Sequence, residues 1–191
     1  MSGRSTTAVV ILAGGASVRM GTAKHMLPFQ SSTMGSIVIE CARECQCAVF
    51  VSGSANWVQD CPVIEDHPRY AGHGPMAGIE AALASGHADR WLILPCDMPL
   101  LEVADLRALI DVKADACCFQ EADGSPLPLP LMLSVKHLDQ VRVALDEGRR
   151  RLGTWLTDLG PHLLDPPPAS RLTNINTPMD YEPFKDASQS R

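Results

Sequence analysis

The chain lacks any Cys-x-x-Cys pair, although seven of its 191 residues are cysteines. Such pairs are typical of structural zinc sites and of thiol redox sites, so the sequence indicates neither class. We expect reduced thiols that pack as small buried apolar groups. Cys96 adjoins Asp97 and is the one cysteine whose position suggests a reactive thiol beside a site, with packing as the alternative.

Long apolar runs are missing as well. No stretch reaches the roughly 20 residues that a membrane-spanning helix needs. The apolar run from Thr7 to Leu12 is too short for the apolar region of a secretory signal. We therefore expect a cytoplasmic protein that has no membrane partner.

Basic residues are outnumbered, with 16 lysines and arginines against 22 aspartates and glutamates and a net charge of -6. A nucleic-acid-binding protein normally needs a basic face, so the composition argues against a nucleic-acid partner. No Gly/Ser-rich or charged linker divides the sequence, and 46% of its residues are hydrophobic. We predict a single domain over residues 1–191, in which a few local residues handle any bound phosphate.

A glycine-rich segment, residues 12–24, directly follows an apolar stretch that has the composition of a β-strand. Gly14 and Gly15 lack Cβ atoms, so backbone N–H groups can approach an anion closely at this turn. Arg19 and Lys24 supply the positive charge that a triphosphate needs. The segment contains neither the Gly-x-Gly-x-x-Gly dinucleotide fingerprint nor a Walker loop. It predicts a different nucleotide-binding fold, the alternative being a plain turn with scattered surface charge.

Apolar segments and helical periodicities alternate along the chain. This alternation predicts an α/β fold, a three-layer α/β/α sandwich with a mostly parallel central sheet. Proline-rich residues 124–130 are interpreted as a rigid loop over the site, with recognition by a proline-binding partner as the alternative. The pattern becomes less regular after Glu147, and the three prolines 166–168 predict a stiff surface connection. The basic residues Arg149 to Arg151 suggest a solvent-exposed start or end of a helix. A functional alternative is that they form an anion-binding edge. The expected strands cover residues 8–11, 48–51, 62–64, 91–94, 116–120 and 129–133, and the expected helices 33–44, 75–84, 102–112 and 136–145.

Two aspartates follow predicted strands and are candidate site residues. Asp97 comes after the strand 91–94, and Asp66 follows the short strand 62–64. Ligands of parallel sheets bind beyond the carboxyl ends of the strands, so both carboxylates should lie on the edge that carries the glycine-rich segment. Asp97 can hold Mg²⁺, which takes one or two carboxylates and completes its shell with water and phosphate oxygens. A helix cap for Asp97 and an ordinary turn for Asp66 are the alternatives.

Two further motifs complete the candidate site. Gly74 and Gly78 lie four residues apart at the start of a predicted helix, so one helix face lacks bulk and can approach neighbouring backbone or ligand. Asn174 and Asn176 flank an apolar residue in an extended segment, so both amides point to the same side.

The string Leu-Ala-Gly-Gly-x-Ser-x-Arg-Met-Gly-x-x-Lys resembles the opening motif of the nucleotidyltransferase family that includes molybdenum cofactor guanylyltransferase. Ile-Glu-Asp, Gly-Pro-Met-Ala-Gly, Pro-Cys-Asp-Met-Pro, Glu-Gly-Arg-Arg and Asn-Ile-Asn-Thr-Pro follow in the family's order, so the resemblance spans nearly the whole chain. It implies a Rossmann-like nucleotidyltransferase fold, with nucleotide binding in the N-terminal part and pterin binding in the C-terminal part. It also implies transfer of GMP from GTP to the phosphate of molybdenum-bound molybdopterin, with release of pyrophosphate.

The resemblance also implies roles for particular residues and partners. Lys24 and Asp97 would contact the nucleotide, and Asp97 would hold Mg²⁺. From their charge we predict that Arg19 and Lys24 stabilise the triphosphate, so the candidate catalytic residues are Arg19, Lys24 and Asp97. Asn174 and Asn176 would bind the acceptor. Recipient molybdoenzyme apoproteins and other cofactor-biosynthesis proteins would be partners. The implied nucleotide-binding positions are Leu12, Ala13, Gly14, Lys24, Asp66 and Asp97. Gly15 of the glycine-rich turn and Ser52, which stands where relatives often have asparagine, are added as candidate nucleotide-binding residues.

Two departures and three alternatives stay open. Relatives often carry asparagine where this chain has Ser52, and residues 124–131 differ from the family's pattern. A cytidylyltransferase for the same pterin, another small-molecule nucleotidyltransferase, and a non-catalytic cofactor-binding chaperone remain alternatives. Base preference discriminates the enzymes, while the combination of Lys24 with Asp97 argues against the chaperone.

Overall fold

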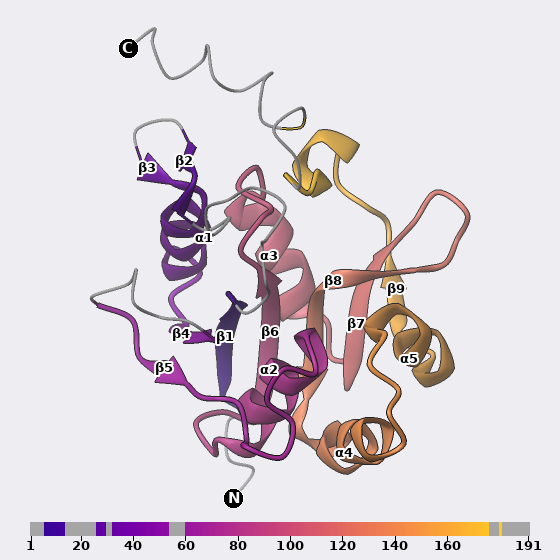
Figure 1. Ribbon diagram of the computed structural model, residues 1–191. Coiled ribbons are helices and arrows are strands. Elements are labelled where there is room, and N and C mark those ends of the chain that lie inside the picture. Colours follow the sequence, from indigo (N-terminus) through magenta and orange to yellow (C-terminus); the bar gives the residue numbers. More distant parts are fainter. Residues whose placement is uncertain (1–5, 14–25, 30–31, 54–59, 176–179, 181–191) are drawn as a thin grey trace, which may run out of the picture.

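A seven-stranded sheet with helices on both faces forms the centre of the computed structural model (Figure 1). The structure describes residues 6–13, 26–29, 32–53, 60–175 and 180. The strand order is β5-β4-β1-β6-β8-β7-β9, and only β8 runs antiparallel to its neighbours in this sheet. The strands are β1 (Thr7–Leu12), β4 (Ala48–Ser52), β5 (Val63–Ile64), β6 (Arg90–Pro95), β7 (Ala116–Gln120), β8 (Pro126–Ser134) and β9 (His162–Leu164), and β2 (Pro28–Phe29) and β3 (Ser32–Thr33) form a separate pair.

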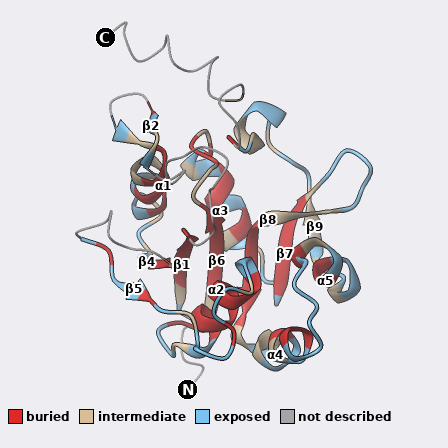
Figure 2. Cartoon of the chain, viewed as in Figure 1, coloured by how far each residue is buried: buried red, intermediate tan, exposed pale blue. Residues whose placement is uncertain are grey.

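The sheet separates the core into two layers, one on each of its faces. The buried residues are concentrated on the central strands and on parts of the helices (Figure 2). Alternate residues of β1 face opposite sides: Val9 and Ile11 pack with α1 and α3, whereas Val10 packs with α2, α4 and α5. Because both faces are covered, β1 is a continuous apolar run. The predicted α/β/α sandwich with a mostly parallel sheet is confirmed. The helices are α1 (Met34–Arg43), α2 (Pro75–Ala84), α3 (Val103–Asp111), α4 (Leu138–Asp146) and α5 (Leu152–Leu159), with 3-10 turns at Val135–His137 and Ala169–Leu172.

Capping residues set the helix starts close to their predicted positions. Thr33 precedes α1, and its hydroxyl accepts a hydrogen bond from the backbone N–H of Ser36. Gly74 precedes α2 with a φ of 68°, a conformation that favours glycine, and Pro75 occupies the first turn, where its missing N–H costs nothing. No helix among the described residues is both long and apolar enough to cross a membrane.

The prediction of a rigid loop at residues 124–130 is wrong, because Pro126 begins strand β8. Proline cannot donate a ladder hydrogen bond, which usually keeps it out of central strands. Here β6 pairs with residues 131–134 of β8, so Pro126 and Pro128 lie beyond that pairing. The turn itself is shorter: the backbone N–H of Gly124 donates to the carbonyl of Glu121 over 3.0 Å.

Residues after Glu147 are more regular than expected, since they include α5 and β9. The buried residues of α5 lie at helical spacing: Leu152, Trp155 and Leu156. This pattern indicates a helix, but the segment is so short that the pattern was not recognised in the sequence. Arg149 to Arg151 are exposed, and Arg151 is the N-cap of α5, as predicted for a solvated helix start. Residues 166–168 form the expected connection without regular structure.

An ion pair between a buried carboxylate and a partly exposed guanidinium joins α2 to α4. Glu80 is 1% exposed, and its Oε1 accepts a hydrogen bond of 2.8 Å from Nε of Arg142. Its Oε2 has no hydrogen-bond partner within the described part of the chain. Burial of a carboxylate without a counter-charge destabilises the folded state. Arg142 supplies the positive charge that offsets the burial of Glu80.

Arg142→Ala is therefore expected to lower the free energy of unfolding by about 3 kcal/mol. Urea denaturation followed by circular dichroism measures the change. Arg107→Ala is the matched control, because Arg107 is exposed and donates only to the backbone carbonyl of Glu44 among the contacts described. Equal stability of the two variants would contradict this role for Arg142.

Candidate functional site

The carboxyl ends of four parallel strands meet at one edge of the sheet. Leu12 at the end of β1 pairs with Ser52 of β4 on one side and with Pro95 of β6 on the other. Ser52 in turn pairs with Ile64 of β5. The four strands thus end in a single row, and the residues that follow each strand leave the sheet at the same edge. We call this edge the strand rim.

Ser52 connects two of the predicted nucleotide-binding residues at the strand rim. Its backbone carbonyl accepts a hydrogen bond of 2.9 Å from the N–H of Ala13. Its hydroxyl donates to Oδ1 of Asp66 over 3.2 Å. Ser52 is 2% exposed and Asp66 is half-buried, so the Asp66 carboxylate is the part of this pair that faces outward.

Gly78 of α2 has no side chain, and Ser52 occupies the space that a side chain at this position would need. A Cβ atom on Gly78 would lie 2.6 Å from Oγ of Ser52 and 2.8 Å from Cδ2 of Leu12. Both separations are well below van der Waals contact, so this helix position must lack a side chain. The predicted close approach holds at Gly78, where the neighbours are side chains of the strand rim rather than backbone. It does not hold at Gly74, where a Cβ atom would meet nothing within 4 Å.

A hydrogen bond and an ion pair connect the loop that carries Asp66 to α4. The Tyr70 hydroxyl donates a hydrogen bond of 3.0 Å to Oδ1 of Asp146, and Arg69 forms an ion pair of 2.8 Å with the same carboxylate. Tyr70 is 5% exposed. Sequence reasoning missed this anchor, although a tyrosine within a polar loop is a usable signal, because its ring packs while its hydroxyl needs a partner.

The C-terminal part of the chain returns to the loop that follows β6. The backbone N–H of Ile175 donates a hydrogen bond of 2.9 Å to the backbone carbonyl of Asp97. Ile175 is fully buried and packs with Phe29 and Met34. This contact brings Asn174, which is exposed, close to Asp97, which is half-buried. The structure thus joins the Asn-x-Asn segment to the strand rim.

Five predicted site residues lie outside the described residues, so their roles stay predictions. They are Gly14, Gly15, Arg19, Lys24 and Asn176. Within the described residues, no group of three or more histidine, cysteine or acidic side chains forms a metal site. Asp97 nevertheless offers a half-buried oxygen ligand of the kind that Mg²⁺ prefers. A metal held there would take its remaining ligands from water and substrate phosphates.

The cysteines are free thiols, and three of them are fully buried. Burial disfavours the thiolate and raises the pKa of Cys41 to about 12, that of Cys117 to about 11 and that of Cys118 to about 12. These thiols are therefore protonated at neutral pH and pack as apolar groups, as predicted. Cys96 is half-buried and lies against the core layer of α1 and α3.

Comparison with known proteins finds relatives that match most of the chain. Residues 9–161 match the model of the MobA-like NTP transferase domain. The chain is 31% identical over 162 residues to a probable molybdenum cofactor guanylyltransferase of Bacillus cereus, and this match covers 80% of each protein.

Two solved structures share this fold over nearly the whole chain. Molybdopterin-guanine dinucleotide biosynthesis protein A from Archaeoglobus fulgidus superposes with a TM-score of 0.77 at 19% identity, covering 97% of this chain and 100% of that one. A Mycobacterium tuberculosis protein solved in complex with manganese superposes with a TM-score of 0.62 at 20% identity, covering 96% and 100%. Both show the fold, and the second shows that a protein of this fold has been crystallised with a divalent metal.

Proposed function

Because this chain belongs to the MobA-like NTP transferase family, we propose that it transfers GMP from GTP to the phosphate of molybdenum-bound molybdopterin. The products would be the molybdopterin guanine dinucleotide cofactor and pyrophosphate. The observation that carries this proposal is the convergence of Ala13, Asp66 and Asp97 at the strand rim, with the Asn174 segment beside Asp97. A donor nucleotide and an acceptor phosphate both need polar groups at one such edge.

The proposed reaction is an in-line displacement at the α-phosphorus of GTP. An oxygen of the acceptor phosphate forms a new bond to this phosphorus. The bond from phosphorus to the bridging oxygen breaks, and pyrophosphate leaves with that electron pair. Transfers of this type depend mainly on positioning and on neutralising oxygen charge, so no protein nucleophile is needed.

Each proposed residue has one task in this displacement. Asp66 would accept hydrogen bonds from the nucleoside, and Arg19 and Lys24 would neutralise the triphosphate oxygens. Asp97 would hold Mg²⁺, which supplies positive charge to the oxygens of the leaving pyrophosphate when bound. Asn174 and Asn176 would orient the acceptor.

Ser52 acts in this scheme through Asp66 rather than through direct contact with the nucleotide. Its hydroxyl is buried and fixes Oδ1 of Asp66, which leaves Oδ2 for the nucleoside. Ser52→Ala is expected to raise the KM for GTP about fivefold with kcat nearly unchanged, because one hydrogen bond of about 1 kcal/mol is lost. Steady-state kinetics of pyrophosphate release measure both constants.

Ser134→Ala is the matched control for this variant. Ser134 is also buried, but it lies at the end of β8 and its hydroxyl accepts a hydrogen bond from the backbone N–H of Lys136. We expect its KM to match that of the unmodified protein. The same rise of KM in both variants would show a general effect of losing a buried hydroxyl and would refute the positioning role of Ser52.

Calorimetric titration with GTP, CTP and ATP, each with and without Mg²⁺, tests the proposed function. We expect GTP with Mg²⁺ to bind most tightly of the three nucleotides. When the molybdenum-bound pterin is then added, we expect pyrophosphate to be released. Preference for CTP would favour the cytidylyltransferase alternative instead. Binding of GTP and pterin without any release of pyrophosphate would favour the cofactor-binding chaperone.

A further inference from the structure

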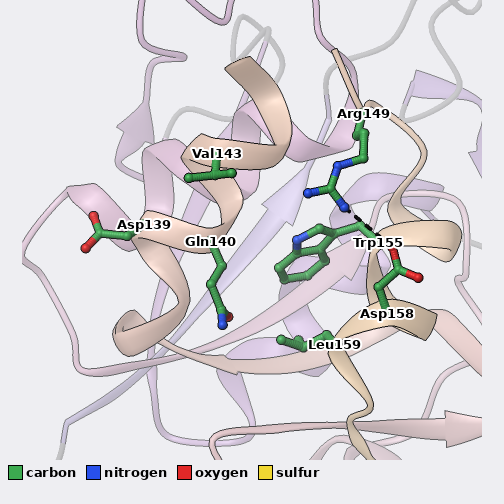
Figure 3. A pocket seen from close by; sticks show the side chains of 7 residues that line it. All are labelled: Asp139, Gln140, Val143, Arg149, Trp155, Asp158 and Leu159. Atoms are coloured by element: carbon green, nitrogen blue, oxygen red, sulfur yellow. Dashed lines mark hydrogen bonds and ion pairs between the residues drawn. The ribbon is translucent and has the colours of Figure 1, made fainter. Parts of the chain in front are cut away.

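A cavity of about 320 Å³ lies between α4 and α5, away from the strand rim (Figure 3). The two helices pack beside α2 and β8 and approach the cavity from opposite sides. Neither the proposed reaction nor the family match assigns a role to it. The lining residues are Asp139, Gln140, Val143, Arg149, Trp155, Asp158 and Leu159.

The inner wall of this cavity is apolar, and its edge is polar and exposed to solvent. Trp155 is 4% exposed and Leu159 is half-buried, so they form the inner part. Val143 is 51% exposed and is one of three large hydrophobic side chains that are exposed within the described residues. An apolar centre surrounded by exposed polar groups is typical of a protein interface, in which one or two inserted side chains supply most of the affinity.

The polar lining does not suit a small metabolite. A metabolite site needs buried polar groups that fix the orientation of the ligand. Asp139, Gln140, Arg149 and Asp158 are all exposed at the edge of the cavity. The exposed carboxylates of Asp139 and Asp158 can instead pair with basic side chains of a polypeptide that covers the cavity from outside.

Carboxylates outnumber guanidinium groups among the lining residues and their ion-pair partners. Arg149 pairs with Glu147 over 2.8 Å and lies 3.4 Å from Asp158, so its charge is already matched. Asp139 adds a third carboxylate among the lining residues and their ion-pair partners. Three carboxylates therefore outnumber one guanidinium, so a basic side chain of a partner would be attracted to the cavity.

We propose that this cavity docks a polypeptide segment of a partner protein. The segment inserts an aliphatic or aromatic side chain between Val143 and Trp155. It sets a lysine or arginine against Asp139 and Asp158. Because this contact uses no residue of the strand rim, its failure and the failure of the proposed transferase function are separate results.

Selection from a phage-displayed library of random 12-residue peptides, with the full chain as target, tests the proposal. We expect enriched peptides that contain an apolar residue next to a lysine or arginine. Fluorescence anisotropy of a synthetic version should show binding about tenfold weaker to Val143→Glu and to the double variant Asp139→Lys, Asp158→Lys, the size expected for interface residues of this kind. Asp111→Lys, an exposed position at the end of α3, is the matched control and should bind normally.

The alternatives give distinct results in the same experiments. Peptides without basic residues, or equal binding to all variants, would overturn the proposal. Sedimentation equilibrium detects a second copy: a dimer that Val143→Glu dissociates would assign the cavity to self-association and also overturn it. Thermal melting by circular dichroism confirms that each variant is folded, and Val143→Ala provides a milder change at the same position.

Discussion

Asp97→Ala is expected to reduce pyrophosphate release by about 1,000-fold, the scale seen when a group that stabilises transition-state charge is removed. The carboxylate is the proposed metal ligand at the strand rim, so its loss would leave the leaving-group oxygens without compensating charge. The backbone hydrogen bond from Ile175 to Asp97 does not use the carboxylate and should persist. The measurement is the initial rate with GTP, Mg²⁺ and the molybdenum-bound pterin.

Two controls make this result specific. Asp97→Asn retains the shape of the side chain but not its charge, and we expect a loss of similar size. Asp111→Ala removes an exposed carboxylate from the end of α3 and should leave the rate unchanged. If the Asp97→Ala variant turned over at the normal rate with metal present, the metal-holding role would be refuted.

Gly78→Ala is the second change for which we expect a large effect. The new Cβ would lie 2.6 Å from Oγ of Ser52 and 2.8 Å from Cδ2 of Leu12, so the side chains of the strand rim must shift. Overpacking of this kind costs roughly 1–3 kcal/mol. Because Ser52 holds Asp66, we also expect weaker GTP binding. Chemical denaturation measures the stability, and calorimetric titration measures the affinity for GTP.

Gly153→Ala is a closely matched control, since Gly153 also lies within a helix. There the nearest atom to the new Cβ is Cγ of Pro128 at 3.3 Å, a distance that a small adjustment can relieve. Replacing glycine by alanine in a helix gains about 1 kcal/mol in helix propensity, so this variant should be neutral or more stable. Equal stability changes at Gly78 and Gly153 would show that the contact with Ser52 is unimportant.

The sequence predicted those elements whose patterns are local. The strand β1 is an unbroken apolar run, and α2 begins at a glycine followed by proline, so both were found near their true bounds. The prolines of β8 gave a misleading local signal, because whether a strand tolerates proline depends on which residues its neighbour pairs with. Local patterns do not contain that information.

The candidate site divides in a similar way. The positions of Asp66 and Asp97 at the strand rim were predicted from the rule for parallel sheets. The bond from Ser52 to Asp66 and the space left by Gly78 depend on the register of three separate elements. No spacing in the sequence reports such a register, so these contacts required the structure. The roles of Arg19 and Lys24 stay predictions.

The hydrogen bond between Ile175 and Asp97 has a consequence for the order in which the site is completed during synthesis. The strands β1, β4, β5 and β6 all precede Asp97 in the chain, so the segments that form the strand rim leave the ribosome early. The Asn174 segment is translated after all four of these strands. A truncated chain that stops before Ile175 would retain the strand segments of the rim without the segment that reaches Asp97, so the proposed acceptor side forms last.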